Sequence, residues 1–346
     1  MIPRTSPSCQ SDKTQLNQTD CPPTHWQRVL ANAIREPAEL LKYLNLPESL
    51  LKGANTANQS FALRVPRGYC QNIEKGNPND PLLRQILPIE AELIHDSAFT
   101  LDPVADLAAM EAPGLLHKYN GRVLIITTAA CAVHCRYCFR RHFPYQENRA
   151  EQNWQDTVEY IRANTDIHEV ILSGGDPLSL TESRLKNLTD KLINIPHIKT
   201  LRIHTRQPIV LPERVNDELL SWIDSLPWKV VIVLHCNHAN EISPMVTSAL
   251  KKLHQQQVTL LNQSVLLAGV NDNLEVLLNL STKLFESNVL PYYLHMLDKV
   301  KGAQHFSVKS EKALHLLNQM RHHLPGYLVP RLVEEIAGKK SKTAIF

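Results

Sequence analysis

A chain of 346 residues is long enough to bury a substantial core, in one large domain or two smaller ones. Its formal net charge is +3 and its pI about 8.4, a balance that does not by itself indicate a nucleic-acid partner. No run of eighteen apolar residues occurs, so we expect no membrane span. Residues 1–25 are polar and lack the apolar stretch of a signal peptide, and we interpret them as a flexible tail.

Residues 26–118 show no regular alternation of strands and helices. Two segments near the start, 25–34 and 37–44, carry apolar side chains at the three-to-four spacing of amphipathic helices. Segments 61–67 and 77–88 are punctuated by proline, which indicates connectors around short helices. We therefore predict a helical N-terminal cap that packs on the part of the chain that follows it.

Between residues 119 and 325 six short apolar segments alternate with helical ones. The apolar segments are rich in Val, Ile and Leu and do not alternate strictly, which is typical of parallel strands covered by helices. We predict strands at 123–128, 169–173, 200–204, 229–235, 259–265 and 290–296, with helices beginning near Trp154, Glu182, Val215, Pro244 and Leu274 and a last helix at 310–324. Six such units are two short of a closed barrel. The predicted fold class is α/β, an open, partial (β/α)6 barrel followed by a short C-terminal segment, 326–346.

Polar residues follow the predicted strands. Parallel α/β barrels carry their chemistry at the C-terminal ends of the strands. This chain has a cysteine-containing loop after the first strand, and the later polar stretches are 173–178, 204–208, 235–241, 262–264 and 295–299. Because six strands deliver polar residues to one rim, we predict one functional site there.

Three cysteines, Cys131, Cys135 and Cys138, share that first loop at a C-x3-C-x2-C spacing. Thiolates suit zinc or iron–sulfur clusters, and clusters are usually held by four of them. Three cysteines would leave one iron of a [4Fe–4S] cluster open, and an open metal position is typical of catalytic sites. A structural zinc site with His134 or His142 as fourth ligand is the alternative, although His134 lies inside the first spacer and would strain the loop. Clustered cysteines need reducing conditions, so we expect a cytoplasmic location.

Two further features belong to the same predicted rim as the cysteines. Gly174 and Gly175 come straight after a strand, where missing side chains let the backbone approach a ligand, although such a pair alone is more often a turn. Arg140 directly follows the cysteines, and its guanidinium is suited to a carboxylate or phosphate. A solvated or salt-bridged arginine is the alternative. We favour an anion-binding role because this loop must lie at the mouth of the site.

The cysteine spacing, followed by the aromatic Phe139, resembles the radical S-adenosylmethionine (SAM) superfamily, in which the open iron binds the amino and carboxylate groups of SAM. The resemblance implies that Gly174, Gly175 and Asp176 form the glycine motif that binds the amino group of SAM. In this chain Asp176 stands in place of the commoner glutamate.

Nearly everything from residue 27 onward resembles the lysine 2,3-aminomutase family, and more narrowly its short bacterial form, which supplies β-lysine for modification of translation elongation factor P. The segments that carry the resemblance are 61–67, 77–85, 113–119, 131–145, 173–178, 201–212, 237–242, 261–272, 291–298 and 326–343. They cover far more of the chain than the cysteine motif alone.

The resemblance implies conversion of (S)-α-lysine to (R)-β-lysine with three cofactors: a [4Fe–4S] cluster, SAM and pyridoxal 5′-phosphate (PLP). SAM is cleaved to a 5′-deoxyadenosyl radical, which removes a β-hydrogen from lysine held as a Schiff base with PLP, and the nitrogen then migrates. The cofactors carry the chemistry, and the protein orients them and excludes water. The implied partners are lysine, a reductant for the cluster, elongation factor P and its β-lysine ligase. Nucleic acid and membrane are not among them, and a homodimer stays open.

Four cofactor-binding roles carry over by position. Lys342 would form the resting Schiff base with PLP, and Arg122 would lie at the PLP phosphate. His235 and Gln263 would sit near SAM and PLP. Only the resemblance singles out Lys342, since it is one of several lysines in a polar terminus.

Substrate-binding roles carry over in the same way. Arg140 would hold the substrate carboxylate, and Asp298 and Glu335 would receive the ε-ammonium, which needs paired charge when buried. Two positions depart from the longer aminomutases: Glu335 stands where they have aspartate, and His295 replaces a tyrosine. The longer carboxylate shortens the pocket by about one methylene, worth roughly 1–3 kcal/mol in discrimination. The chain also ends four residues after Lys342, without the C-terminal extension of those enzymes.

Three alternatives stay open. The substrate could be another amino acid such as arginine, whose charges the same two carboxylates would satisfy. A PLP-independent radical SAM enzyme acting on a peptide or nucleotide would show no effect of Lys342→Ala on cofactor content. A non-catalytic iron–sulfur partner protein would bind a cluster without isomerising lysine. Asp298 opposite Arg140 favours the aminomutase, because a scaffold has no need for a bipolar amino-acid pocket.

Overall fold

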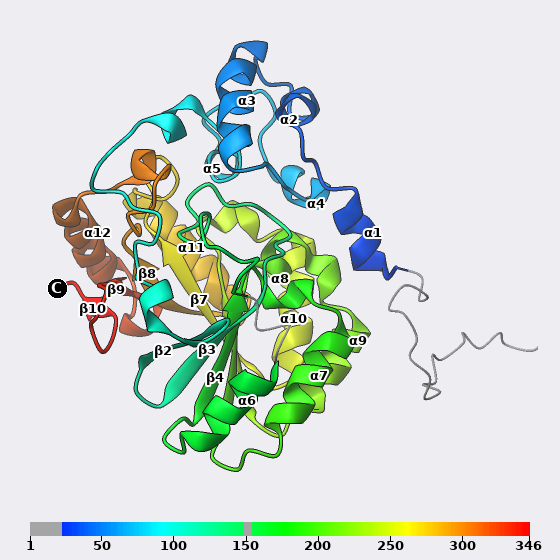
Figure 1. Ribbon diagram of the computed structural model, residues 1–346. Coiled ribbons are helices and arrows are strands. Elements are labelled where there is room, and N and C mark those ends of the chain that lie inside the picture. The colour runs from blue at the N-terminus through cyan, green and yellow to red at the C-terminus, as the bar shows by residue number, and fades with distance from the viewer. Residues whose placement is uncertain (1–22, 149–153) are drawn as a thin grey trace, which may run out of the picture.

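The computed structural model describes residues 23–148 and 154–346 (Figure 1). Residues 1–22 of the predicted tail lie outside the described residues. Ten strands form one sheet whose spatial order follows the chain. They are β1 (Met110–Ala112), β2 (Leu115–Tyr119), β3 (Arg122–Thr128), β4 (Glu169–Gly174), β5 (Thr200–Thr205), β6 (Lys229–Leu234), β7 (Thr259–Val265), β8 (Leu290–His295), β9 (Arg331–Glu334) and β10 (Thr343–Ala344).

The six central strands, β3 to β8, are parallel to one another and agree with the six predicted strands to within one residue at each end. Helices connect them, as an open, partial barrel requires. These are α6 (Trp154–Ala163), α7 (Glu182–Leu192), α8 (Gln207–Val210), α9 (Asp217–Asp224), α10 (Pro244–Gln255), α11 (Leu274–Glu286) and α12 (Ser310–His323). Figure 1 shows α6, α7, α9 and α10 together on one side of the sheet. The predicted α/β fold class is confirmed.

Local sequence determines where these helices begin. The side chain of Ser243 accepts a hydrogen bond from the backbone N–H of Val246 at the start of α10, where Pro244 occupies the first turn. Asn273 caps α11 in the same way, accepting from the N–H of Glu275. Such caps satisfy N–H groups that have no partner within the helix. The helices therefore begin close to where the sequence predicts them.

Strands β5 and β7 differ from the expected uniform burial, because buried and half-buried residues alternate along both. Arg202 and His204 of β5, and Gln263 and Val265 of β7, face a cavity. Successive side chains of a strand point to opposite faces of a sheet. One face of these strands therefore packs under helices, and the other lines a hollow interior.

The sequence prediction includes residues 110–118 in the helical cap, 26–118, and the structure corrects this. They form β1 and β2, with β2 antiparallel to β3. Leu115 and Leu116 at the start of β2 are buried. At the other edge of the sheet β9 adds a further parallel strand beside β8, and β10 runs antiparallel to β9. These flanking strands are short, and their neighbours in the sheet supply the hydrogen-bond partners that keep them extended.

The segment before β1 is helical. Its helices are α1 (His25–Ala31), α2 (Pro37–Tyr43), α3 (Leu51–Ser60), α4 (Arg67–Cys70) and α5 (Pro81–Arg84). The sequence does not predict α3, since only Ala54 and Ala57 of this helix are buried and its apolar periodicity is weak. The buried side chains of the helical segment belong to the same hydrophobic core as the inner strands of the sheet.

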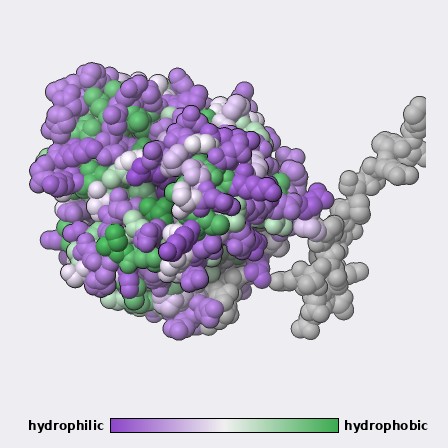
Figure 2. Space-filling view, turned by 90° about the horizontal axis from the view of Figure 1, so that it is seen from above, coloured by the Kyte–Doolittle hydropathy of each residue, from purple (hydrophilic) through white to green (hydrophobic). Residues whose placement is uncertain are grey.

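No helix in the described ranges is long and apolar enough to cross a membrane. Figure 2 shows one face of the molecule, where hydrophilic residues predominate and hydrophobic ones gather in small patches. Scattered apolar side chains of this kind are normal on globular proteins.

Candidate functional site

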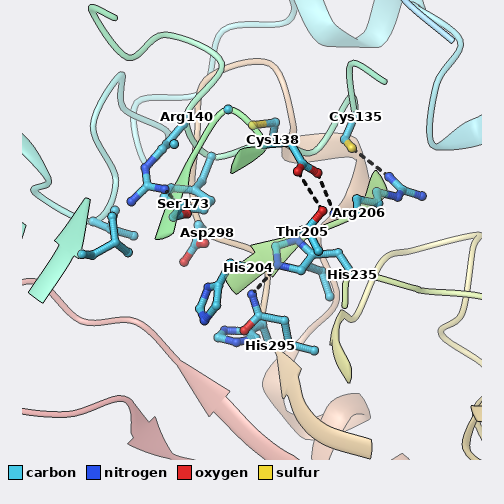
Figure 3. Close-up of a pocket in the computed structure, with 18 of the residues that line it drawn as sticks. Cys135, Cys138, Arg140, Ser173, His204, Thr205, Arg206, His235, His295 and Asp298 are labelled. Atoms are coloured by element: carbon cyan, nitrogen blue, oxygen red, sulfur yellow. Dashed lines mark hydrogen bonds between the residues drawn. The ribbon is translucent and has the colours of Figure 1, made fainter. Parts of the chain in front are cut away.

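The inner face and C-terminal rim of the sheet surround a cavity of about 590 Å³ (Figure 3). Every residue that the sequence singles out for a cofactor, metal or substrate role lines it. They are Cys131, Cys135, Cys138, Arg140, Arg122, Gly174, Gly175, Asp176, His235, Gln263, Asp298, Glu335 and Lys342. The cavity is therefore the candidate active site.

The loop that carries the cysteines is held by the helical N-terminal segment. Glu92 accepts two hydrogen bonds from the guanidinium of Arg136, at 2.8 and 2.6 Å, and forms an ion pair with Arg141 at 2.7 Å. The backbone N–H of Arg136 donates to the carbonyl of Gln85 at 2.9 Å. All three charged side chains are buried from water. The segment thus fixes the loop between Cys135 and Cys138.

The thiols themselves suit a cluster better than a single ion. Among the described residues no group of three or more His, Cys, Asp or Glu side chains could hold one metal ion. A cluster does not need such a group, because each cysteine binds a different iron. The rings of His134 and His142 each bond through one nitrogen to a backbone carbonyl, that of Ala62 and that of Lys301. Neither ring joins the cysteines in a group of described residues that could hold a zinc ion.

Burial raises the pKa of the Cys138 thiol to about 11 and that of Cys131 well above its ordinary value. Metal binding to such thiols must displace their protons.

Gly174 and Gly175 bring the end of β4 against the chain that leads into the cysteine loop. A Cβ on Gly174, whose φ is +119°, would lie 2.8 Å from the carbonyl oxygen of Thr128, and one on Gly175 would lie 2.5 Å from that of Ala130. Both distances are too short for a side chain. The two glycines therefore let this backbone pack closely against the protein's own chain before the cysteine loop.

Asp176 is buried, and all its acceptor positions are used within the protein. One carboxylate oxygen accepts from the N–H of Leu178 and from the hydroxyl of Thr205, and the other accepts from the N–H groups of Arg206 and Gln207. Burial raises its pKa to about 6, although these hydrogen bonds oppose the rise. Asp176 holds the turn after β5. A bound ammonium would have to share an oxygen with these donors.

A cationic group lies on one part of the cavity wall. The carboxylate of Asp106, 2% exposed, accepts from Nε of Arg140 at 2.7 Å and pairs with Nζ of Lys118 at 2.6 Å. Arg140 also donates to Oγ of Ser173 at 3.1 Å. One carboxylate between two cations leaves a net positive charge, as an anion site needs. The sequence does not indicate a role for Asp106 or Lys118, since Asp106 lies in an irregular connector with no periodic signal.

An anionic group lies on another part of the wall. Glu335 accepts a hydrogen bond from the hydroxyl of Tyr119 and pairs with Nζ of Lys342 at 2.7 Å. Burial would raise the pKa of Glu335, but Lys342 and Tyr119 outweigh it and lower that pKa. Burial raises the pKa of Asp298 to about 7 even though Lys342 opposes the shift. The sequence gives no hint that Lys342 and Glu335 pair with each other.

Three uncharged imidazoles also line the cavity. Burial, with Arg206 nearby, lowers the pKa of His235 to about 3, and the amide of Gln263 lies 2.8 Å from its Nε2. Burial also lowers the pKa of His204 and His295 well below its ordinary value. Their Nε2 atoms are buried and find no protein partner within the described ranges. These orphaned atoms fit a cavity that is completed by bound molecules.

Arg122 lies far from the cysteine loop along the same strand. It begins β3, whereas the loop follows its last residue, Thr128, and six steps of ~3.3 Å separate the two. Its guanidinium stacks 4.7 Å from the ring of Tyr119. The cavity therefore extends along the inner face of the sheet, with room for more than one ligand.

Residues 125–280 match the radical SAM superfamily. The L-lysine 2,3-aminomutase of Haemophilus influenzae is 47% identical over 320 residues, which cover 92% of this chain and 95% of that protein. This chain belongs to the lysine 2,3-aminomutase family. The L-lysine 2,3-aminomutase of Escherichia coli K12 is also 47% identical, over 323 residues and 94% of its length.

A longer family member, the L-lysine 2,3-aminomutase of Clostridium subterminale, is 34% identical over 322 residues, which cover 92% of this chain and 77% of that protein. The chain thus resembles the short bacterial members more closely, as its sequence predicts. As a member of the lysine 2,3-aminomutase family it is an enzyme of the isomerase class.

Membership of the radical SAM superfamily implies a [4Fe–4S] cluster and SAM. The residues present fit these groups, because three reduced cysteines and several unpartnered polar atoms meet in one cavity.

Proposed function

We propose that this protein is a lysine 2,3-aminomutase that converts (S)-α-lysine to (R)-β-lysine. The observation that carries the proposal is the charge pattern of the cavity. A net cationic group around Arg140 suits an α-carboxylate, and the carboxylates of Asp298 and Glu335 suit a side-chain ammonium. Buried charges need such partners, so a zwitterionic, dibasic amino acid fits the wall.

The cofactors of the family would be held by the residues that line the cavity. Cys131, Cys135 and Cys138 would ligate the cluster, and Lys342 would hold PLP through its Nζ with Arg122 at the phosphate. When bound, the cluster with SAM supplies the radical that removes a hydrogen from the substrate, and PLP supplies the group that carries the migrating nitrogen.

The same proposal includes five further cofactor-binding residues. Gly174 and Gly175 would offer backbone to SAM, Asp176 would contribute to the same pocket, and His235 and Gln263 would lie beside the two organic cofactors. The uncharged state of the imidazole fits this role, because a neutral ring nitrogen can accept or donate a hydrogen bond without adding a buried charge.

The protein's own task is to orient the substrate and exclude water. Arg140 is fixed by Asp106 and Ser173, so its free N–H groups have a defined direction. Glu335 is fixed by Tyr119 and is paired with Lys342. When Lys342 is bonded to a cofactor, Glu335 becomes available to a substrate ammonium. Side chains that are already fixed in this way lose less conformational entropy when the substrate binds.

The test is anaerobic turnover. Protein reconstituted with iron, sulfide and PLP is given SAM, dithionite and lysine, and β-lysine is measured by mass-resolved chromatography. We expect product from the wild type and none from Lys342→Ala or Cys135→Ala. SAM cleavage without β-lysine would overturn the lysine assignment, and the same assay with arginine would then test the other dibasic substrate. A cluster without SAM cleavage would favour a non-catalytic partner.

We also propose that the β-lysine serves to modify elongation factor P in the cytoplasm, through the ligase that attaches it. The support is the resemblance to the short bacterial form, at nearly full length. In a strain lacking this gene, we expect intact-mass analysis of elongation factor P to show loss of the β-lysyl group. Added β-lysine should restore it. Retention of the group in the deletion strain would contradict the link.

A further inference from the structure

The guanidinium of Arg206 touches one of the three cysteines. Arg206 follows β5 directly, is 5% exposed, and places Nη1 2.8 Å from Sγ of Cys135 and 2.6 Å from the hydroxyl of Tyr137. Figure 3 shows the contact between Arg206 and Cys135 at the edge of the cavity. Its Nε–H is buried and meets no acceptor among the described residues. Arg206 thus contacts the cysteine loop through Nη1 and keeps one donor, Nε–H, without a partner among the described residues.

Other buried groups lock this guanidinium in place. Nη2 donates to Oε2 of Glu241 at 2.7 Å and to Oε1 of Gln85 at 2.7 Å. Glu241 is completely buried, and its other oxygen accepts the backbone N–H groups of Asn237 and His238. With Nη2 held on this side, Nη1 donates to Cys135 and Tyr137 of the cysteine loop.

A buried ion pair is an expensive way to stabilise a fold, because both charges lose their hydration. Arg206 and Glu241 are both withdrawn from water. The contact with Cys135 gives the pair a role that a hydrophobic replacement could not have. Hydrogen bonds to cluster sulfurs are one of the means by which proteins set the reduction potential of an iron–sulfur cluster.

We propose that Arg206 is a positioning residue that hydrogen-bonds Cys135 Sγ in the loaded site and raises the reduction potential of the cluster, while Glu241 orients the guanidinium and moderates its charge. The proposal rests on the cysteine ligation given under the proposed function. The step concerned is transfer of one electron from an external reductant to the oxidised cluster, with no change in its bonds to the protein.

The direction of the effect follows from charge. Reduction adds one negative charge to the cluster, and a cationic N–H donor beside a cluster sulfur stabilises that charge. Removing the guanidinium should therefore shift the potential to more negative values. Removing the carboxylate of Glu241 should shift it to more positive values, because the positive charge of Arg206 is then no longer opposed.

The experiment is a redox titration of the reconstituted, cluster-loaded protein without SAM, followed by the electron paramagnetic resonance signal of the reduced cluster. The variants are Arg206→Gln, Arg206→Lys and Glu241→Gln. Arg202→Gln is the matched control. Arg202 lies on β5, the strand that leads to Arg206, and also lines the cavity, but it pairs with Glu169 instead of a cysteine.

We expect Arg206→Gln to have a more negative potential than wild type, Glu241→Gln a more positive one, and Arg202→Gln an unchanged one. Arg206→Lys should fall between wild type and Arg206→Gln, because lysine keeps the charge but lacks the planar fork. Equal potentials in wild type, Arg206→Gln and Glu241→Gln would overturn the proposal.

If Arg206→Gln does not load a cluster, the potentials of Glu241→Gln and Arg206→Lys test the proposal. Potentials equal to that of the wild type in both variants would overturn it. Absence of a cluster in the wild type would instead overturn the proposed cysteine ligation, which iron and sulfide analysis reports separately. The two failures are therefore distinguishable.

Discussion

At the scale of single residues, Asp298 connects burial with substrate binding. Burial raises its pKa to about 7. A carboxyl group carries its charge only above its pKa, so below pH 7 Asp298 becomes neutral and can no longer pair with an ammonium. We predict that the KM for lysine rises as the pH falls below 7. Asp298→Asn should raise KM about tenfold or more above pH 7, where the wild-type carboxylate is charged, since a hydrogen bond to a charged group contributes ~1.5–3 kcal/mol. Below pH 7 the KM values of variant and wild type should converge.

The measurement is a KM profile from pH 5.5 to 8.5 for wild type and Asp298→Asn. In the variant, KM should no longer rise near pH 7, although other titrating groups can still change KM at other pH values. A profile with the same inflection in both proteins would show that another group titrates there.

Asp106 is the residue on which the cationic part of the cavity depends. It lies between Arg140 and Lys118 in a buried position. Burial would raise its pKa, but these two cations lower it, so the carboxylate stays charged in the folded protein. We predict that Asp106→Asn lowers the free energy of unfolding by about 3–5 kcal/mol, because two buried cations lose their counter-charge. Urea titration followed by circular dichroism measures this change.

The control for Asp106 is Asp272→Asn. Asp272 pairs with Lys312, whose side chain is half exposed, and such surface pairs contribute at most about 1 kcal/mol. A loss of stability in Asp106→Asn no larger than that in Asp272→Asn would contradict the buried-pair argument. The KM for lysine should rise in the Asp106 variant alone.

At the scale of elements, the contact between β4 and the chain after β3 positions the cysteine loop. The Cβ added by Gly175→Ala would lie 2.5 Å from the carbonyl oxygen of Ala130, and this oxygen belongs to backbone that cannot rotate away. We predict that the variant folds but binds less iron, because the loop must shift. Iron and sulfide per chain after reconstitution measure the effect, with circular dichroism as the test of folding.

Gly326→Ala is the matched control, since a Cβ at Gly326 meets no atom within 4 Å. It should load as much iron as the wild type. Full iron content in Gly175→Ala, with unchanged circular dichroism, would show that the close approach at Gly175 is not what positions the loop.

Elements also differ in how far the sequence predicts them. Strands β3 to β8 have six or seven residues each, with strong apolar character, so composition alone located them. Strands β1, β9 and β10 have two to four residues, and they are extended because a neighbouring strand holds them. The pattern of α3 is weak for a similar reason, since it buries only two alanines.

The same distinction applies to the cavity. Residues that directly follow a predictable strand, such as Gly174 and His235, could be assigned to one rim from the sequence. Asp106, Glu92 and Gln85 could not, because they lie in irregular connectors and reach the cysteine loop only through tertiary contacts. The roles of Lys342 and Glu335 depended on family resemblance, and their mutual ion pair became visible only in three dimensions.

At the scale of the whole molecule, the helical N-terminal segment and the barrel are one structural unit. Buried side chains from both, among them Leu40 and Tyr69 of the segment and Val123 and Leu201 of the sheet, belong to one hydrophobic core. The segment also supplies the buried carboxylate of Glu92 to the cysteine loop. Because one core spans the helical segment and the inner strands, we expect these two parts to unfold together.

We predict that Glu92→Gln weakens this whole unit and not the helical segment alone. Arg136 and Arg141 would both remain buried without their counter-charge, which should lower the free energy of unfolding by about 3–5 kcal/mol. Urea unfolding, followed in parallel by circular dichroism and tryptophan fluorescence, should give coincident curves for wild type and variant, with the midpoint of the variant shifted to lower urea.

Glu39→Gln is the matched control within the helical segment. Glu39 pairs with Arg67, and the two side chains are 42% and 43% exposed. Glu39→Gln should therefore lower the free energy of unfolding by at most about 1 kcal/mol. Two separate transitions in Glu92→Gln would show instead that the segment unfolds by itself. In that case the cysteine loop could lose its support while the barrel stays folded, and cluster content would fall at urea concentrations below the main transition.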